Sequence, residues 1–336
     1  EYTNKMYIAR QDLRQIRRII VADYRETVDY ILGIPLFAQK IGKENLSSLL
    51  CRLGNPEKAI PAVHVAGTNG KGSTCRALAQ MLTGMGYRVG LFTSPHLVSI
   101  NERIQIDGEN ISDADFVWAF ETVKEKFTQH PSFFEVMFAM AAVYFREKKC
   151  DFVVYETGMG GRLDATNVLM PELSIITSVG MDHMEYLGDT IEKIAAEKAG
   201  IIKPGIPIIY FKRDEAVAKV IEDTARGQKS PVIPVEKQDY IINHLGDKTI
   251  DFSLHSRYYS YCNLVIQKTS LYQLENISLA VMAFYGLMKA QNASEEDIEK
   301  GIRETLPEFY WEGRMEEIAR IYMWMAHTTS RQSGHI

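Results

Sequence analysis

A glycine-rich loop carries the clearest chemical signal in the sequence. In the segment VAGTNGKGST, Val65 takes the place of the first glycine of the common phosphate-loop pattern G-x-x-x-x-G-K-[ST], and Gly72 follows Lys71. An apolar run precedes the loop and a helical stretch follows it, so the N–H groups of a helix N-terminus would face a bound anion. We therefore interpret the segment as a phosphate-binding loop rather than a surface turn. Lys71 would reach the β- and γ-phosphates, and Ser73 or Thr74 would serve Mg²⁺ or a phosphate oxygen, with ATP and GTP both open as ligands.

Polar side chains follow two further apolar runs. Glu156 ends the run DFVVYE, and Asp182 and His183 follow the run LSIITSVG. Open α/β sheets bind their ligands at the carboxyl ends of the strands. A carboxylate, an imidazole and a serine hydroxyl can hold one or two Mg²⁺ ions, with phosphate oxygens completing the coordination. The sequence therefore predicts a magnesium site beside the phosphate loop.

Other polar segments carry weaker signals when taken alone. The segment TSPHLVSINERIQIDG is rich in hydrogen-bonding groups, among them Ser94, His96 and Arg103, but such a segment is more often a solvated loop than a site. Lys198 and Lys203 lie in AAEKAGIIKPG, where the pattern is that of two surface lysines on an amphipathic helix. The glycines of YETGMGGRLDATN lack the spacing of a dinucleotide-binding fingerprint.

The elements that must position these residues alternate between short apolar runs and longer amphipathic stretches. The runs PAVHVAG, RVGLFTS, DFVVYETG, LSIITSVG and IPIIYF are typical of buried strands, and helical patterns separate most of them. This alternation predicts an α/β fold with a doubly wound, mostly parallel sheet flanked by helices. Between about residues 231 and 270 the sequence becomes polar and strand-like, which predicts a small antiparallel β portion. We expect residues 1–305 to form one phosphate-loop domain that includes this portion.

Composition limits the classes of partner and compartment. Of the 336 residues, 46% are hydrophobic and 24% are charged, and the formal net charge is −5. A general affinity for nucleic acid or for an anionic membrane is therefore not expected. The four cysteines show no C-x-x-C spacing, which argues against a zinc site or a disulfide framework. Since no apolar run approaches the roughly 20 residues of a membrane span, we expect a cytoplasmic protein. We also expect a monomer whose partners are small molecules.

Seven segments together resemble one family, the folylpolyglutamate synthase/dihydrofolate synthase branch of the Mur ligases. They are HVAGTNGKGST, LFTSPHLVSINERI, FFEVMFAMA, ETGMGGRLDATN, SVGMDHMEYLG, EKAGIIK and WEGRMEEI, in the order that the family shows. This family uses a short G-T-x-G-K loop, which accounts for the unusual phosphate-loop spelling. The resemblance implies an ATP-dependent amide ligase that acts on dihydropteroate or folate polyglutamates. A carboxylate would take the γ-phosphate of ATP, and the amine of L-glutamate would then displace the phosphate.

The resemblance also implies roles for individual residues. Lys71, His183 and Lys198 would be catalytic, and Lys198 would be a carbamylated lysine that binds a second Mg²⁺ rather than a surface lysine. The implied Mg²⁺ ligands are Ser94, Glu156, His183 and Lys198. The residues implied to bind ATP are Gly67, Thr68, Asn69, Gly70, Lys71, Gly72, Ser73, Thr74, Asn276 and Arg314. Those implied to bind the pterin-containing substrate are Phe133, Phe134, Glu135, Leu163, Asp164 and Ala165.

The end of the sequence departs from the family pattern. The family continues into a Rossmann-like C-terminal domain that begins near a D-G-A-H-N motif, so we expect residues 306–336 to be a linker and a truncated start of this glutamate-ligase domain. Met323, Trp324 and Met325 must be encoded as ATG-TGG-ATG, and the frame two bases later permits Val-Asp-Gly-Ala-His-Asn. We hypothesise a frameshift shortly before Met323 and expect an impaired ligase whose C-terminal domain is largely absent. The alternatives are a non-catalytic ATP·Mg-binding remnant and another Mur-type ligase that acts on a peptidoglycan precursor.

Overall fold

An eight-stranded sheet runs through the computed structural model, which describes residues 23–35, 43–129, 131–267, 270–309, 314–319 and 322–325. The strand order is β4-β3-β2-β5-β1-β6-β7-β8. Strands β2, β5, β1, β6, β7 and β8 pair in parallel, and β3 and β4 extend one edge in antiparallel pairing. The predicted mostly parallel sheet is confirmed. Its strands are β1 Ala62–Ala66, β2 Val89–Phe92, β3 Ile104–Ile106, β4 Glu109–Asn110, β5 Phe152–Glu156, β6 Leu173–Ile176, β7 Ile208–Lys212 and β8 Val232–Glu236.

The parallel strands form where the sequence holds unbroken runs of branched apolar residues. Such runs are typical of a parallel sheet because helices cover both of its faces. In β1, Val63 and Val65 pack into the cluster that contains α3 and α9, whereas Ala62 and Ala66 pack into clusters on the opposite face. Because successive side chains of a strand point to opposite faces, one short segment contributes to both cores.

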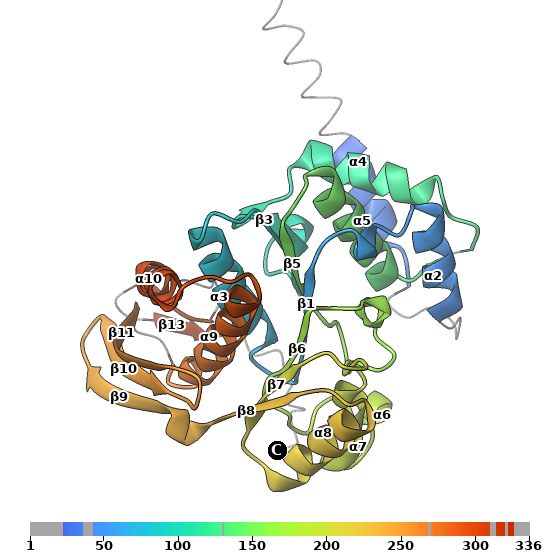
Figure 1. Ribbon diagram of the computed structural model, residues 1–336. Coiled ribbons are helices and arrows are strands. Elements are labelled where there is room, and N and C mark those ends of the chain that lie inside the picture. The colour runs from blue at the N-terminus through green and yellow to red at the C-terminus, as the bar shows by residue number, and fades with distance from the viewer. Residues whose placement is uncertain are drawn as a thin grey trace, which may run out of the picture.

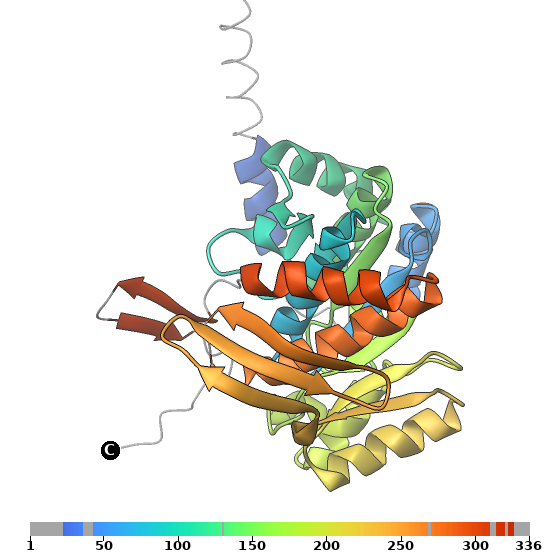
Figure 2. The same cartoon turned by 60° about the vertical axis from the view of Figure 1, so that its left-hand side comes forward.

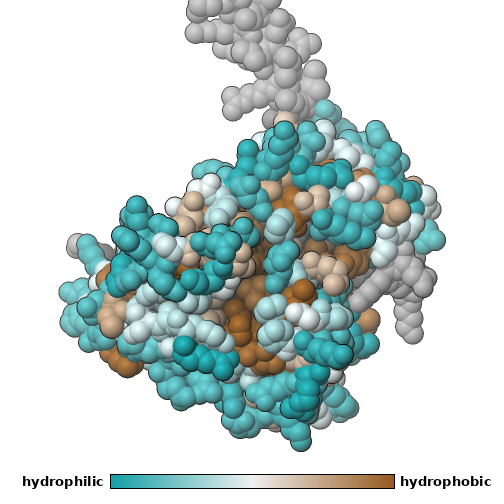
Figure 3. Space-filling model, viewed as in Figure 1, coloured by the Kyte–Doolittle hydropathy of each residue, from teal (hydrophilic) through white to brown (hydrophobic). Residues whose placement is uncertain are grey.

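Helices cover both faces of the sheet, as Figure 1 shows. One face carries α3, α9 and α10, while α5 covers one half of the other face and α7 and α8 cover the second half. On the face drawn in Figure 3, the surface is mostly hydrophilic around a hydrophobic central area. Residues 23–32 are helical, and the helices with both ends described are α2 Lys43–Arg52, α3 Lys71–Gly84, α4 Asp113–Lys124, α5 Phe133–Glu147, α6 Met184–Leu187, α7 Ile191–Ala199, α8 Glu215–Gly227, α9 Gln273–Ala290 and α10 Glu295–Thr305. Within the described part of the chain, no helix has the length and apolar character needed to cross a membrane.

A separate three-stranded antiparallel sheet confirms the predicted β-rich portion. Its strands are β9 Tyr240–Leu245, β10 Thr249–His255 and β11 Ser260–Gln267, in the order β11-β10-β9. Phe252 and Leu254 of β10 are buried in the cluster that α9 also joins. Figure 2 shows this sheet against the side of the molecule that holds α9 and α10. The small sheet therefore packs against α9, the helix that contains the predicted ATP contact Asn276.

Two short strands follow α10. They are β12 Arg314–Ala319 and β13 Tyr322–Met325, which pair in antiparallel fashion. The side chains of these strands lie outside the described part of the structure, and so do residues 326–336. The predicted ATP contact of Arg314, the hypothesised frameshift and the proposed domain boundary near residue 305 therefore remain predictions.

Candidate active site

The phosphate loop connects β1 to α3, and its glycines lie against two other segments of the chain. Gly67 and Gly70 both have positive φ values, of 156° and 86°. A Cβ atom added to Gly67 would lie 1.8 Å from Oγ1 of Thr177, and one added to Gly70 would lie 2.1 Å from Oδ1 of Asn276. Both positions therefore require glycine, because any side chain would collide with a neighbour. Gly70 also caps the N-terminus of α3, where unbonded N–H groups favour a bound anion.

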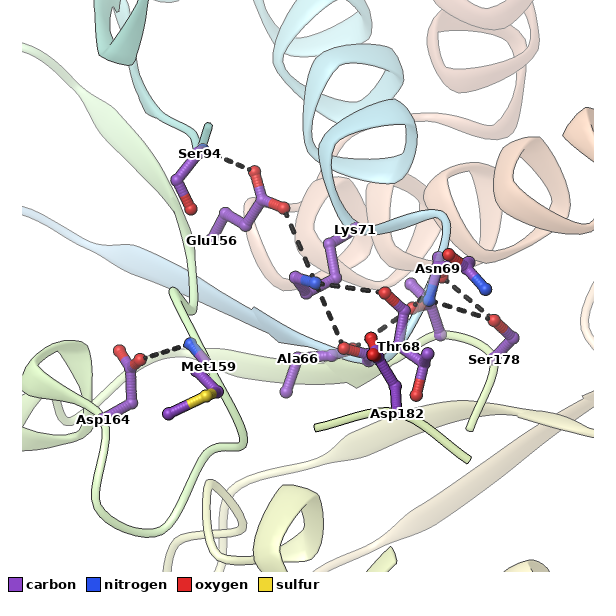
Figure 4. Close-up of polar contacts among 12 residues, drawn as sticks. Ala66, Thr68, Asn69, Lys71, Ser94, Glu156, Met159, Asp164, Ser178 and Asp182 are labelled. Atoms are coloured by element: carbon purple, nitrogen blue, oxygen red, sulfur yellow. Dashed lines mark hydrogen bonds and ion pairs between the residues drawn. The ribbon is translucent and has the colours of Figure 1, made fainter. Parts of the chain in front are cut away.

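The residues that follow β6 hold the loop from the side. The N–H of Thr68 donates to the carbonyl of Ser178 at 2.7 Å, and the hydroxyl of Thr177 donates to the carbonyl of Asn69 at 2.7 Å. The Thr68 hydroxyl also bonds the backbone of Gly180. Figure 4 shows Thr68 and Asn69 beside Ser178. Sequence reasoning missed this support, although two hydroxyl residues directly after a buried strand were its visible signal.

Lys71 folds back over its own loop toward a buried carboxylate. Its Nζ donates to the carbonyls of Gly67 and Thr68, at 3.2 Å and 3.3 Å, and lies 4.0 Å from Oε1 of Glu156. Glu156 is buried at the end of β5, and its Oε2 accepts a 3.0 Å hydrogen bond from the backbone N–H of Ser94. Figure 4 shows this arrangement. The structure thus brings together three predicted residues, Lys71, Glu156 and Ser94.

The carboxylate of Glu156 and the hydroxyl of Ser94 fit a Mg²⁺ site of the kind that substrate phosphates complete. Across the described ranges, no three His, Cys, Asp or Glu side chains gather as a ready-made metal cluster. Mg²⁺ commonly binds through one or two carboxylates, substrate phosphates and water, so a single buried carboxylate beside a phosphate loop suffices. His183 lies on the loop after β6 with φ 48°, and its half-exposed ring has Nε2 3.6 Å from Oδ2 of Asp182.

Lys198 is buried under the phosphate loop, in contrast to the surface position that its sequence pattern alone suggests. Only 2% of this residue of α7 is exposed, and its Nζ donates to the carbonyl of Gly67 at 2.9 Å. Burial, and then the charge of Lys71, lower the pKa of Lys198 to about 7, although Asp182 and Asp164 oppose this shift. Much of this lysine is therefore a neutral amine near neutral pH, and a neutral amine is nucleophilic.

The predicted substrate residues at the start of α5 differ in what their side chains do. Glu135 forms a capping box, because its Oε2 accepts from the N–H and the hydroxyl of Ser132 at 2.7 Å and 2.9 Å. Phe133 is buried. The ring of Phe134 packs against Gly158, since a Cβ atom added to Gly158 would lie only 2.8 Å from this ring. The ring of Phe134 thus borders the glycine segment after β5, while the carboxylate of Glu135 caps the helix.

The three predicted substrate residues after the glycines, Leu163, Asp164 and Ala165, also differ in exposure and in role. Leu163 is 71% exposed, whereas Asp164 is buried. Asp164 accepts hydrogen bonds from the N–H groups of Met159 and Thr166, at 2.9 Å and 3.0 Å, and it caps a 3₁₀ turn that begins at Ala165. Burial raises the pKa of Asp164, and its hydrogen bonds counteract this effect. Asp164 therefore fixes the shape of the loop, and Leu163 is the member of this set that faces solvent.

The first turn of α9 approaches the phosphate loop from the opposite side. The side-chain amide of Asn276 donates to Oε1 of Gln273 at 2.8 Å, and both residues are buried. The hydroxyl of Thr74 donates to the backbone carbonyl of Asn276 at 3.4 Å. One residue earlier, both carboxylate oxygens of Glu275 accept hydrogen bonds from a single nitrogen of Arg213, Nη2. Gln273 and Arg213 carried no sequence signal, since their roles depend on contacts between distant segments.

Comparisons of the sequence with known proteins match this chain to Mur ligases and to folylpolyglutamate synthases. A family model described as the Mur ligase middle domain matches residues 65–293. The dihydrofolate synthase/folylpolyglutamate synthase of Bacillus subtilis (strain 168) is 39% identical over 319 residues, which cover 90% of this chain and 73% of that protein. The folylpolyglutamate synthase of Lacticaseibacillus casei is 33% identical over 309 residues, covering 88% of this chain and 71% of that protein.

Solved structures of folylpolyglutamate synthases also resemble the structure of this chain. An FPGS-AMPPCP complex superposes with a TM-score of 0.82 at 33% identity, covering 89% of this chain and 75% of that one. An FPGS-AMPPCP-folate complex gives the same values. The Mycobacterium tuberculosis folylpolyglutamate synthase complexed with ADP has a TM-score of 0.81 at 28% identity, covering 92% of this chain and 71% of that one.

Proposed function

Because this chain belongs to the Mur ligase family, within its folylpolyglutamate synthase/dihydrofolate synthase branch, we propose that it joins L-glutamate to dihydropteroate or folate polyglutamates at the expense of ATP. The observation that carries the proposal is the placement of Lys71 between the carbonyls of its own loop and the carboxylate of Glu156. This placement supports a role for Lys71 at the γ-phosphate of ATP and for Glu156 as a carboxylate that would bind the metal beside it.

In the first step, an oxygen of the substrate carboxylate attacks the γ-phosphorus of ATP. A P–O bond to the carboxylate forms as the bond to the ADP oxygen breaks, which gives an acyl phosphate and ADP. Phosphoryl transfer depends mainly on positioning and charge neutralisation. Lys71 supplies a mobile cation, since it can leave its carbonyl partners for phosphate oxygens, and the N-terminus of α3 supplies N–H donors.

In the second step, the neutral amine of L-glutamate attacks the acyl carbon. The C–N bond forms, the C–O bond to the phosphate breaks, and the amine loses a proton to give the amide and inorganic phosphate. The charge that collects on the departing phosphate is the same charge that Lys71 and the loop N–H groups already face. The same residues therefore assist both steps.

Glu156 and the hydroxyl of Ser94 would hold Mg²⁺, with His183 and a modified Lys198 as further ligands. Bound there, Mg²⁺ would neutralise negative charge on the phosphates. The imidazole of His183 is half-exposed, which supports its availability as a metal ligand.

Carbamylation would turn Lys198 into an anion. The neutral amine adds to CO₂, forms an N–C bond and releases one proton, which gives a carboxylate-like group. The lowered pKa of Lys198, of about 7, supports this reaction, because burial favours the neutral amine that must attack. The carbamate retains one N–H, which can keep the present hydrogen bond to the carbonyl of Gly67.

The substrate would lie along the aromatic side of the site. Of the two predicted aromatic residues, Phe134 is the partly exposed one, and its ring offers apolar surface to a flat heterocycle. The exposed side chain of Leu163 follows the same glycine segment. The similarity to a structure titled as an FPGS-AMPPCP-folate complex supports a folate-type substrate.

Release of ADP is the test. The purified chain is incubated with ATP, Mg²⁺ and either dihydropteroate or tetrahydrofolate, with and without L-glutamate. We expect ADP release that depends on both the pterin substrate and glutamate. ATP binding without turnover would indicate a non-catalytic remnant, and turnover with a peptidoglycan precursor instead would indicate another Mur-type ligase.

A further inference from the structure

A buried arginine lies at the base of the loop that follows β2. Arg103 ends the 3₁₀ turn η2, Ile100–Arg103, and is 8% exposed. Its backbone carbonyl accepts a 3.1 Å hydrogen bond from the N–H of Thr93, the residue directly before Ser94. Since the N–H of Ser94 bonds to Glu156, the arginine is anchored at the same end of the sheet as this candidate metal ligand.

The side chain of Arg103 reaches a neutral acceptor. Its Nε donates to Nδ1 of His96 at 2.8 Å, which requires that this ring nitrogen carry no proton. Among the residues that the structure describes, the side chain of Arg103 donates one hydrogen bond, through Nε, so its two terminal amino groups have no described hydrogen-bond acceptor.

The guanidinium has an aromatic neighbour at the start of α5 and interacts electrostatically with two carboxylates. Its central carbon lies 5.1 Å from the centre of the Phe133 ring. Glu156 and Glu102 are the carboxylates that raise the pKa of Arg103, which burial lowers to about 10. At neutral pH the side chain is therefore still a cation, held in a region of low dielectric where its attraction for an anion is strong.

We propose that Arg103, held in place by His96, binds the substrate carboxylate that receives the γ-phosphate. This inference rests on the proposed ligase function. The first step brings two anions together, and Lys71 can serve the phosphate but not both groups at once. A guanidinium matches a carboxylate with two parallel hydrogen bonds, which an ammonium cannot do. Arg103 would thus hold one carboxylate oxygen while orienting the other toward the phosphorus.

Equilibrium binding of pteroate and of its carboxamide tests the proposal. Each is titrated calorimetrically into the full chain with Mg²⁺ and AMPPCP, which prevents turnover. We expect the unchanged chain to bind the carboxylate roughly 10- to 100-fold more tightly than the amide, as charge-assisted hydrogen bonds allow. In Arg103→Gln this preference should disappear while the affinity for the carboxamide stays the same, and Arg103→Lys should retain part of it.

Binding of the carboxamide distinguishes a role of Arg103 in binding the substrate carboxylate from a role in maintaining the structure of the site. Arg226→Gln is the matched control, because Arg226 is an exposed arginine of α8 paired with Asp223, and it should keep the full preference. An undiminished preference in Arg103→Gln would overturn the proposal, and so would an equal loss of affinity for both ligands. If the unchanged chain bound neither ligand, the proposed ligase function would fail together with this inference.

Discussion

The substitution Gly70→Ala should destabilise the chain through two separate effects. A residue with a side chain at φ 86° carries a penalty of about 1–2 kcal/mol. The new Cβ would also lie 2.1 Å from Oδ1 and 2.9 Å from Cγ of Asn276, so that side chain must move. Moving it breaks the buried hydrogen bond to Gln273, which contributes about 1–2 kcal/mol. The expected total is about 2–4 kcal/mol.

A double-mutant cycle with Asn276→Ala isolates the collision. The single change Asn276→Ala should cost about 1–2 kcal/mol, because it leaves the amide of Gln273 buried without this partner. In the double variant the collision is absent and only the backbone penalty adds to that loss. The double variant should therefore be about 1–2 kcal/mol more stable than the sum of the single effects predicts.

Urea unfolding followed by circular dichroism measures these free energies. Gly86→Ala is the matched control, since Gly86 has φ 87° and no atom lies within 4 Å of its added Cβ. It should show the backbone penalty alone. Equal destabilisation by Gly70→Ala and Gly86→Ala, or strictly additive effects in the cycle, would refute the close approach of Asn276 to the phosphate loop.

Three further changes probe the site. Lys71→Ala should reduce ADP release at least about 100-fold, because the cation facing the phosphate is lost, and unchanged turnover would exclude Lys71 from catalysis. His183→Ala should raise the Mg²⁺ concentration needed for half-maximal turnover, and an unaltered metal dependence would remove His183 from the metal site. Lys198→Met should alter how stability depends on pH. In the folded chain Lys198, with its pKa of about 7, loses its proton at a lower pH than in the unfolded chain, where its pKa is 10.5. Between these two pKa values, the free energy of unfolding of the unchanged chain should rise by about 1.4 kcal/mol per pH unit relative to that of the variant. If urea unfolding gave the same difference in free energy between the two proteins at pH 7.5 and at pH 9, the burial of this amine would be contradicted.

The sequence predicted the features that depend on local order along the chain. Unbroken apolar runs identified the parallel strands, since a doubly covered sheet requires them. The order of strand, glycines and helix identified the loop around Lys71, and the position of Glu156 at the end of its run placed it beside that loop. These predictions succeeded because each depends on residues close together in sequence.

Other features depend on contacts between distant segments and could not be predicted from periodicity. Lys198 has the spacing of a surface lysine, yet its helix packs under the loop and buries it. Gln273 fixes Asn276, and that pair meets Gly70 from about 200 positions away along the chain. Arg103 belongs to a segment whose composition is that of a solvated loop, and only the folded chain shows that it is buried.

Oxygen-isotope transfer tests the central claim most directly. Dihydropteroate labelled with ¹⁸O in its carboxylate is incubated with the chain, ATP, Mg²⁺ and L-glutamate, and the inorganic phosphate is analysed by mass spectrometry. An acyl phosphate passes one carboxylate oxygen to the phosphate, so each phosphate released with an amide should carry one ¹⁸O atom. Amide formation accompanied by unlabelled phosphate would contradict the acyl-phosphate route, and the absence of any amide would contradict the ligase function itself.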